Sequence, residues 1–380
     1  MMEQADGAIS GLRVIMTGGG TGGHVYPALA VAAGLRAAGA GKILFIGSSR
    51  GMESEVVKRE GWPFRGLPAD YFRGRYPTPD NLRTAVNMVR STLAGARELR
   101  RFRPRVVVAT GGYASVPVAL AAVMARIPLV VLEQDALPGR ANRFLSRFAR
   151  AVCTAYAESI PYFARPGQVK CTGNPVRREV LEAGRKEGRL KLGIPPEDVL
   201  VLGLGGSGGA RTINEAMAEA LSFFESRPNV RLLHVTGPRY FESFRQAVSG
   251  RGWDKLPANV EAVDYLHLVP EALAAADVIV CRAGAVTLAE VTCRGLPAIV
   301  VPSPNVAGDH QAHNARALGT AGAAVVVKDV ELDGRRLVEE LTRLVDDPET
   351  RKEMSRRSLG LSRPGATGDI VNTILETADL

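Results

Sequence analysis

Residues 12–24 read Leu-Arg-Val-Ile-Met-Thr-Gly-Gly-Gly-Thr-Gly-Gly-His, and an alanine-rich segment follows over residues 27–38. The apolar run at residues 12–17 is typical of a buried strand, whereas the alanine-rich segment is typical of a helix. A glycine-rich turn between a strand and a helix leaves backbone amides uncovered at the helix N-terminus, where they can hold a phosphate group. The stretch therefore predicts an α/β domain that begins with a strand, a glycine loop and a helix.

The same alternation of apolar runs and helical segments continues along the first part of the chain. We expect strands at residues 42–46, 106–109 and 129–132, and a helix at residues 116–125 after Thr110-Gly111-Gly112-Tyr113. The expected strands are mostly apolar, as are parallel strands that helices cover on both faces. The prediction is a parallel sheet with helices on both sides.

The pattern restarts at residue 199. An apolar run at residues 199–204 precedes a second glycine loop, Gly205-Gly206-Ser207-Gly208-Gly209, and an expected helix over residues 212–224. Further apolar runs at residues 232–236, 278–281 and 298–301 continue the series. We interpret this as a repeated architecture rather than a short sequence repeat.

A chain of 380 residues has room for two domains. We therefore predict an α/β fold made of two Rossmann-like, doubly wound domains that face each other across a cleft. The expected boundaries are residues 1–165 for the N-terminal domain, 166–196 for a linker, 197–363 for the C-terminal domain, and 364–380 for a final helix that packs back on the first domain.

The composition is that of a globular protein, with 46% hydrophobic residues, 23% charged residues and a formal net charge of +9. The positive charge favours anionic partners, whether nucleotides, nucleic acid or acidic lipid headgroups. Residues 1–10 lack the basic start and apolar core of a secretory signal, so we expect a cytoplasmic chain. The apolar run at residues 116–125 is shorter than the ~20 residues that span a bilayer, so any membrane contact should be peripheral.

Both glycine loops fit the Gly-x-Gly-x-x-Gly template, through Gly18, Gly20 and Gly23 in the first and Gly203, Gly205 and Gly208 in the second. A dinucleotide site would also need an acidic residue after the second strand to bond the ribose. Gly47-Ser48-Ser49 and Gly237-Pro238 stand there instead. This counts against an NAD-dependent oxidoreductase, and glycines that only permit tight turns are the alternative for each loop.

His24 ends the first glycine loop and begins the helix after it. A ring nitrogen at this position would face the region beyond the carboxyl ends of the strands. An imidazole can accept a proton near neutral pH, because its unperturbed pKa is about 6.5. His24 is therefore a candidate general base, with helix capping as the alternative role.

The chain contains no Asp-x-Asp sequence, the usual carboxylate pair that holds a metal on a sugar nucleotide diphosphate. A diphosphate would then be met by amides, hydroxyls and arginine. Arg177, which follows Gly173-Asn174-Pro175, is the candidate arginine, and a plain surface charge is its alternative role. The four cysteines form no Cys-x-x-Cys pair, and we expect neither a metal site nor a cofactor.

Two segments of the second half carry polar side chains suited to a sugar nucleotide. In Arg282-Ala-Gly-Ala-Val-Thr-Leu-Ala-Glu290, a strand end leads through small residues into a helix, and Glu290 could accept both ribose hydroxyls. The loop at residues 302–311 is rich in turn residues and opens another helix, so it can present side chains to a sugar.

Residues 80–105 mix apolar and basic side chains in one expected helix. The apolar members are Leu82, Val86, Met88, Val89 and Leu93, and the basic ones are Arg83, Arg90, Arg97, Arg100, Arg101, Arg103 and Arg105. A basic amphipathic helix can lie on an anionic membrane surface. A helix that faces the core with a solvated back is the alternative.

Six motifs follow one another in a fixed order: Gly19-Gly-Thr-Gly-Gly-His24, Gly111-Gly-Tyr-Ala-Ser115, Glu133-Gln-Asp-Ala-Leu-Pro-Gly139, Gly173-Asn-Pro-Val-Arg177, Gly205-Gly-Ser-Gly-Gly-Ala-Arg211 and Arg282-Ala-Gly-Ala-Val-Thr-Leu-Ala-Glu290. Together they closely resemble the MurG family of bacterial undecaprenyl-diphospho-muramoylpentapeptide N-acetylglucosaminyltransferases. The resemblance runs from Gly18 to Gln311 and covers most of the chain.

This resemblance implies a GT-B fold and an inverting transfer of N-acetylglucosamine from UDP-N-acetylglucosamine to the C4 hydroxyl of the muramoyl sugar of lipid I, which gives lipid II for peptidoglycan. No metal is essential to that scheme, and no nucleic acid is a partner. The resemblance also implies peripheral attachment to an anionic membrane surface, on the cytoplasmic face of the plasma membrane, through the helix at residues 80–105.

The resemblance also implies roles for individual residues. His24 is the leading general-base candidate, and Tyr113 and Glu133 belong to the acceptor side. The implied donor-binding residues are Thr21, Gly22, Gly23, Asp135, Arg177, Ser207, Leu266, Ala285, Val286, Thr287, Leu288, Ala289, Glu290 and Gln311. Among these, Leu266 would meet the uracil, Glu290 the ribose and Gln311 the sugar.

The chain departs from the family pattern at two positions. Asp135 stands where the family usually has asparagine, so a carboxylate that only accepts when ionised replaces an amide that can donate. Gly208 stands where a glutamine is usual and leaves only backbone beside the expected diphosphate. A nucleotide-sugar-binding protein without catalysis is therefore one alternative, although the intact His24 motif argues against it. A glycosyltransferase that acts on another lipid is a second alternative, and the acceptor pocket decides between it and the transfer to lipid I.

Overall fold

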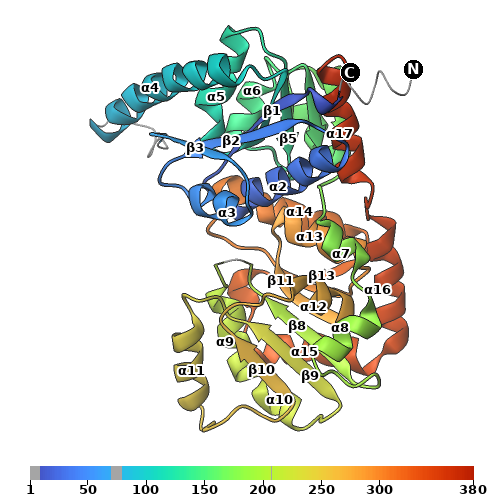
Figure 1. The fold of residues 1–380 in the computed structure, drawn as a ribbon. Coiled ribbons are helices and arrows are strands. Elements are labelled where there is room, and N and C mark those ends of the chain that lie inside the picture. Colours follow the sequence, from blue (N-terminus) through green and yellow to red (C-terminus); the bar gives the residue numbers. More distant parts are fainter. Residues whose placement is uncertain (1–8, 70–78, 207) are drawn as a thin grey trace. The chain divides into compact units, whose positions relative to one another are not determined.

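The computed structural model describes residues 9–69, 79–206 and 208–380 (Figure 1). The chain forms two compact units: Met1–Pro175 with Gly365–Leu380, and Val176–Pro364. Each unit contains one parallel sheet with helices between its strands. The predicted fold class of two Rossmann-like α/β domains is confirmed.

The first unit contains a seven-stranded parallel sheet in the order β3-β2-β1-β4-β5-β6-β7. Its strands are β1 (Arg13–Gly18), β2 (Lys42–Ser48), β3 (Phe64–Leu67), β4 (Val106–Gly111), β5 (Leu129–Glu133), β6 (Ala151–Thr154) and β7 (Val169–Cys171). β1 lies between β2 and β4, where Val14 pairs with Ile43 on one side and Val106 on the other. The four strands expected from the sequence are all present, whereas the short strands β3, β6 and β7 were missed.

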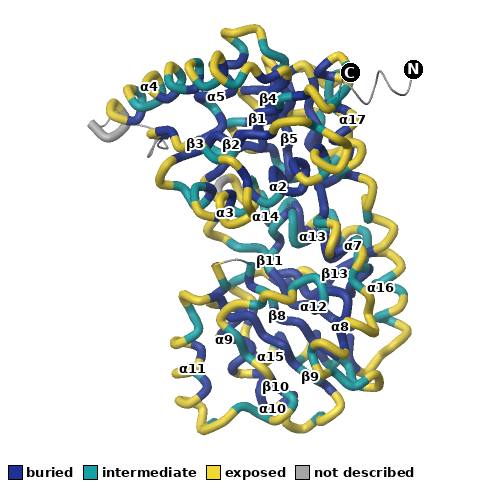
Figure 2. Tube along the Cα trace, viewed as in Figure 1, coloured by how far each residue is buried: buried dark blue, intermediate teal, exposed yellow. Residues whose placement is uncertain are grey.

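Helices cover both faces of this sheet. They are α2 (Gly22–Ala37), α3 (Glu53–Arg59), α4 (Pro79–Phe102), α5 (Ser115–Met124), α6 (Arg140–Leu145) and α17 (Ala366–Thr377), with the 3-10 turns η1 (Ala157–Tyr162) and η2 (Pro166–Gln168). Val14 and Met16 pack with α2, α3 and α17, whereas Ile15 between them packs with α4, α5 and α6. The central strands are therefore buried on both sides (Figure 2).

The second unit repeats this plan with a six-stranded parallel sheet in the order β10-β9-β8-β11-β12-β13. Its strands are β8 (Val199–Leu204), β9 (Val230–Val235), β10 (Val260–Val263), β11 (Val278–Arg282), β12 (Ala298–Val301) and β13 (Ala324–Val326). In chain order within the unit, the arrangement reads 3-2-1-4-5-6, the order of a dinucleotide-binding sheet. The first six strands of the first unit have the same order.

The second unit is also covered on both faces. Its helices are α7 (Arg178–Glu182), α8 (Arg185–Lys191), α9 (Arg211–Glu219), α10 (Leu221–Glu225), α11 (Phe241–Ser249), α12 (Val269–Ala275), α13 (Ala285–Cys293), α14 (His310–Thr320), α15 (Gly334–Asp346) and α16 (Pro348–Gly360), with the 3-10 turns η3 (Ala307–Asp309) and η4 (Asp329–Glu331). α9, α10, α11, α15 and α16 pack on one face, and α7, α12, α13 and α14 on the other. Among the described residues, no helix is both long and apolar enough to cross a membrane.

The strand order creates one switch point in each sheet. After β1 the chain enters α2 on one face, whereas after the neighbouring β4 it enters α5 on the other face. β8 and β11 lead in the same way to α9 and α13 on opposite faces. Ligands of such sheets bind outside the carboxyl ends of the strands at this point. Both predicted glycine loops lie there.

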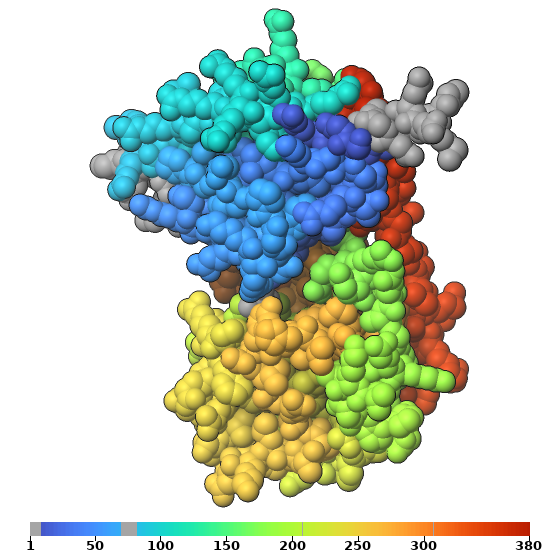
Figure 3. All heavy atoms as spheres, in the orientation of Figure 1, coloured from blue at the N-terminus to red at the C-terminus, as the bar shows by residue number. Residues whose placement is uncertain are grey.

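The expected linker at residues 166–196 is divided between the two units. Residues 166–175 add η2 and β7 to the first unit, and residues 176–196 add α7 and α8 to the second. The final helix α17 belongs to the first unit, where Ile370, Val371 and Ile374 join the core beneath α2. Figure 3 shows the last residues, in red, beside that unit.

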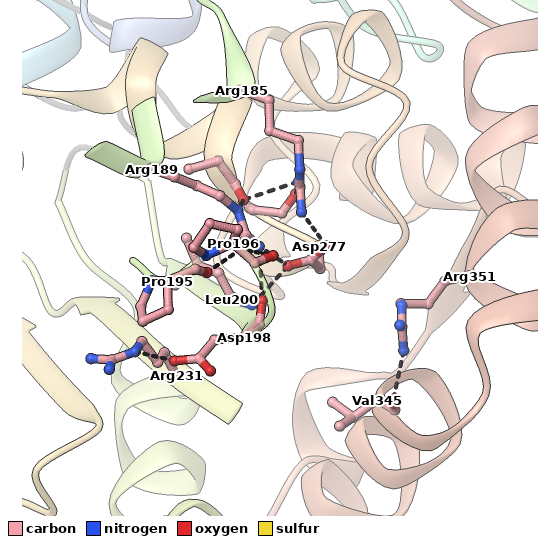
Figure 4. Close-up of polar contacts among 12 residues, drawn as sticks. Arg185, Arg189, Pro195, Pro196, Asp198, Leu200, Arg231, Asp277, Val345 and Arg351 are labelled. Carbon is pink, nitrogen blue, oxygen red and sulfur yellow. Dashed lines mark hydrogen bonds and ion pairs between the residues drawn. The ribbon is translucent and has the colours of Figure 1, made fainter. Parts of the chain in front are cut away.

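Arg189 of α8 holds the start of the second sheet (Figure 4). Its guanidinium donates to the carbonyl oxygens of Pro195 at 2.6 Å and Pro196 at 2.9 Å, and it pairs with Asp277 at 2.6 Å. Asp277 also accepts from the backbone N–H of Leu200 in β8 at 2.8 Å. The Arg189 side chain is only 6% exposed, so these bonds form away from bulk water.

Replacing Arg189 with methionine should lower the free energy of unfolding by about 3 kcal/mol, because the carbonyl groups of Pro195 and Pro196 lose their donor and Asp277 loses one of its two arginine partners. Urea denaturation measures the change. Arg178→Met is the matched control, since Arg178 is an exposed arginine paired with Glu182 in the same region. Equal losses in the two variants would contradict the structural role of Arg189.

Candidate functional site

The first glycine loop of the first unit places His24 in the opening turn of α2. Thr21 precedes the helix in an extended conformation, and His24 follows after Gly22 and Gly23. Thr110, at the end of β4, donates its hydroxyl to the His24 carbonyl oxygen at 2.8 Å. The backbone of the histidine is therefore bonded to the end of β4 at the switch point.

Hydrogen bonding assigns the tautomer of the His24 ring. Nδ1 lies 3.1 Å from the Gly19 carbonyl oxygen and 3.1 Å from Thr21 Oγ1. A carbonyl oxygen can only accept, so the Gly19 contact requires a proton on Nδ1. In the neutral ring Nε2 then carries the lone pair, which is the state that a general base needs.

The loop after β4 in the same unit lies against the His24 ring. A Cβ atom at Gly111 would lie 2.9 Å from His24 Cδ2 and 3.0 Å from Asn142 Nδ2, so only glycine allows this approach. The Tyr113 ring, two residues on, packs against Gly20 of the first loop. His24 and Tyr113, which we predicted from separate motifs, therefore line one region.

Glu133 ends β5 and binds the loop that follows it. Its carboxylate accepts from the backbone N–H groups of Asp135 and Gly139 and from Nδ2 of Asn142, each at 3.0 Å. The residue is only 4% exposed. The Glu133 side chain therefore holds its own loop, including Asp135, against the end of the sheet.

The surroundings of Glu133 disfavour its charge. Burial, and after it the negative charge of Asp135, raise the pKa of Glu133 from 4.5 to about 7, although its three hydrogen bonds act in the opposite direction. Asp135 is the residue that departs from the family pattern. The departure therefore places a second carboxyl group beside a buried one.

In the second unit, the start of α13 gathers a run of predicted donor-binding residues. Gly284 precedes the helix, and Ala285, Val286, Thr287, Leu288 and Ala289 form its first turns. Glu290 follows and is 4% exposed. Its carboxylate pairs with Nε of Arg177 at 2.8 Å. Arg177 and Glu290, 113 residues apart, are thus brought together.

Two further predicted donor residues of this unit follow the strands β10 and β12. Leu266 follows β10 and packs partly against the core. Gln311 opens α14 after β12, and its Oε1 accepts from the backbone N–H of Ser303 at 2.8 Å. Ser207 of the second glycine loop lies outside the described residues.

Arg282 supports the loop that carries Gln311. At the end of β11, its guanidinium donates to the carbonyl oxygens of Val301 at 3.2 Å and Pro302 at 3.3 Å and pairs with Asp329. Thr212 of α9 donates to the same aspartate at 3.0 Å. Arg282 therefore ties the 302–311 loop to the switch point of the second sheet.

Comparisons with known proteins cover both units. Residues 14–154 match the glycosyltransferase family 28 N-terminal domain, and residues 199–368 match the glycosyltransferase family 28 C-terminal domain. A Desulforudis audaxviator protein, named UDP-N-acetylglucosamine–N-acetylmuramyl-(pentapeptide) pyrophosphoryl-undecaprenol N-acetylglucosamine transferase, is 42% identical over 97% of this chain and 99% of its own. The chain belongs to the MurG family of glycosyltransferases. A Moorella thermoacetica transferase of the same name is 43% identical over 97% of this chain and 100% of its own.

A solved structure agrees with this family membership. Acinetobacter baumannii MurG has a TM-score of 0.74 to this family member at 27% identity, and the match covers 96% of this chain and 99% of the other. The resemblance in the six motifs is thereby confirmed at the level of the family.

Sequence reasoning missed three residues that support the site of this glycosyltransferase. Asn142 bonds Glu133, Arg282 braces the 302–311 loop, and Glu53 accepts from the backbone N–H of Gly20 at 3.0 Å. Arg282 is the first residue of a motif identified in the sequence, so it could have been predicted as a residue of the site. Asn142 and Glu53 lie outside the glycine loops, and only the fold brings them there.

The raised pKa of Glu133 predicts a pH dependence of stability. The protonated form is favoured in the folded chain, so the stabilisation from Glu133 is fully present below about pH 4.5 and is lost as the pH rises through about 7. Asp135→Asn removes a charge that disfavours the Glu133 carboxylate. We therefore expect this variant to unfold at higher urea concentration than the wild type, by a margin that grows from pH 5 to pH 8.

Urea denaturation at each pH measures that margin. Asp254→Asn serves as the control, because Asp254 is exposed and far along the chain from Glu133. A margin that stays constant with pH would show that Asp135 does not act on Glu133.

Proposed function

We propose that this chain transfers N-acetylglucosamine from UDP-N-acetylglucosamine to the C4 hydroxyl of the muramoyl sugar of lipid I, with inversion, and so forms lipid II for peptidoglycan. The observation that carries the proposal is the 42% identity over 97% of the chain to a transferase of that name. The geometry around His24 supports it, since its Nδ1 lies 3.1 Å from the Gly19 carbonyl oxygen, a contact that favours the neutral tautomer with its lone pair on Nε2.

His24 is the proposed general base. As the C4 hydroxyl of the acceptor attacks C1 of the donor sugar, His24 Nε2 takes the hydroxyl proton, and the bond from C1 to the diphosphate oxygen breaks. A positioned base of this kind contributes ~10²–10⁴-fold to the rate. Thr21, Gly22 and Gly23 bring backbone N–H groups to the same turn, where they would face the donor.

The second unit is the proposed donor site. Glu290 accepts the ribose hydroxyls, Arg177 and the first amides of α13 meet the diphosphate, and UDP departs with negative charge that these groups stabilise. In the same proposal Leu266 contacts the uracil and Gln311 the sugar. Ser207 is assigned to the diphosphate from the sequence alone.

Tyr113 and Glu133 are proposed for the acceptor side. Glu133 would act through the loop that its carboxylate holds, because all three of its bonded donors belong to residues 135–142. Asp135 sits in that loop, where the donor contact of this family is expected. The acceptor sugar would then meet a surface that Glu133 shapes.

α4 is the proposed membrane contact, at the cytoplasmic face. Its side chains at positions 82, 86, 89 and 93 are apolar and 45% to 70% exposed, and their spacing places them on one helix face. Arg83, Arg90 and Arg97, seven residues apart, form an exposed basic row beside them. Such a surface suits anionic headgroups and peripheral attachment.

The transfer reaction tests the proposed function. Labelled N-acetylglucosamine should pass from its UDP donor to a lipid I analogue with EDTA present, and His24→Ala should slow this transfer by ~10²–10⁴-fold. Calorimetry of UDP binding is the control, because His24→Ala should keep donor affinity and Glu290→Ala should lose it. Donor binding without transfer by the wild type would refute the lipid I assignment and favour another lipid acceptor or a binding protein.

Vesicle sedimentation tests the α4 surface. The triple variant Leu82→Ser, Val89→Ser and Leu93→Ser should bind phosphatidylglycerol vesicles at least about tenfold more weakly, since it removes buried apolar area from the contact. The matched control is Leu190→Ser, Val330→Ser and Leu359→Ser, which alters exposed apolar residues of the other unit. Equal weakening in both triple variants would refute the assignment to α4.

A further inference from the structure

One peptide group connects His24 to a buried carboxylate. The peptide between Gly19 and Gly20 uses its carbonyl oxygen to accept from His24 Nδ1 at 3.1 Å. The N–H of the same peptide group, which belongs to Gly20, donates to Oε2 of Glu53 at 3.0 Å. Glu53, a single amide and the proposed base therefore form one continuous chain of hydrogen bonds.

Glu53 is built into the loop at which this chain of bonds begins. It opens α3 and is only 1% exposed. Its other oxygen, Oε1, accepts from the backbone N–H of Ser48 at the end of β2, at 2.8 Å. A Cβ atom at Gly19 would overlap the carboxylate, so the glycine loop lies directly against it.

We propose that Glu53 is a positioning residue for His24, acting through the peptide between Gly19 and Gly20. The inference rests on the proposed role of His24 as the base. In many enzymes a carboxylate orients a catalytic histidine by bonding its ring directly. Here Glu53 would have the same role, but a peptide group lies between the carboxylate and the ring.

The peptide group between Gly19 and Gly20 links Glu53 to the orientation of the His24 ring and to its electrostatic environment. Glu53 fixes the plane of the peptide, and the peptide carbonyl then holds the His24 ring with its proton on Nδ1. Successive hydrogen bonds polarise one another, so the Glu53 charge makes the Gly19 carbonyl oxygen a better acceptor. When Nε2 takes the acceptor proton, the ring becomes positive, and the same chain of bonds stabilises it.

A carboxylate explains this arrangement better than packing alone. Burial of a charged group is costly unless hydrogen bonds compensate for it, and both oxygens of Glu53 accept from backbone N–H groups. A neutral glutamine of the same shape has one acceptor oxygen and would turn its amide N–H₂ toward the other donor. The negative charge of Glu53 would therefore act on His24 in a way that a neutral side chain of the same shape could not.

The test combines Glu53→Gln with Glu55→Gln, a matched control on the exposed side of α3. Glu53→Gln should lower kcat/KM for transfer about 10- to 100-fold. It should also move the acidic limb of the kcat/KM profile to lower pH by about half a unit or more, because a ring without the carboxylate holds its proton less tightly. Glu53→Asp keeps the charge and should recover part of both changes, whereas Glu55→Gln should match the wild type.

Nitrogen NMR of labelled histidine, without substrate, separates this inference from the proposed function. The wild-type His24 ring should carry its proton on Nδ1 when neutral, and Glu53→Gln should lower its titration midpoint. A folded Glu53→Gln protein with an unchanged midpoint would overturn the inference, as would a wild-type ring protonated on Nε2. If Glu53→Gln does not fold, the wild-type protein alone tests the inference: a neutral His24 ring protonated on Nδ1 supports it, and one protonated on Nε2 overturns it. Failure of transfer to lipid I, with these NMR results as expected, would overturn only the proposed function.

Discussion

The reversal of strand order in each parallel sheet is the constraint on which the rest of the structure depends. Because β1 and β4 send their helices to opposite faces, the loops after them diverge and leave backbone N–H groups and side chains accessible between them. The same geometry recurs between β8 and β11. His24, at the start of α2, and the run of proposed donor residues at the start of α13 lie at these two switch points.

The central strands could be predicted from the sequence because they are buried on both faces and consist of continuous apolar runs. β3, β10 and β13 could not, because each lies at an edge of its sheet, spans four residues or fewer and carries a mixed burial pattern. The 166–196 region was mistaken for a linker because its prolines and charges resemble one. In the structure those charges, Arg189 above all, bond backbone carbonyl groups of a folded segment.

Motifs identified His24, Arg177 and Glu290 because each stands beside a glycine-rich or small-residue turn with a recognisable spacing. Glu53 gave no such signal, since an acidic residue at a helix start is ordinarily a solvated charge that favours the helix dipole. The fold reverses that expectation by burying it against the first glycine loop. Spacing along the chain therefore indicates the residues proposed to meet a ligand, whereas the residues that support them depend on tertiary packing.

The chain passes from the first unit to the second after Pro175 and returns at Gly365. The core of the first unit includes Ile370 and Ile374 of α17, which follow the whole second unit in the sequence. Residues 176–364 form their sheet from one continuous stretch of chain, whereas the first unit needs a helix that is synthesised after that stretch. A product that stops before Gly365 would therefore leave apolar residues of the unit that carries His24 uncovered, even though its seven strands had all been made.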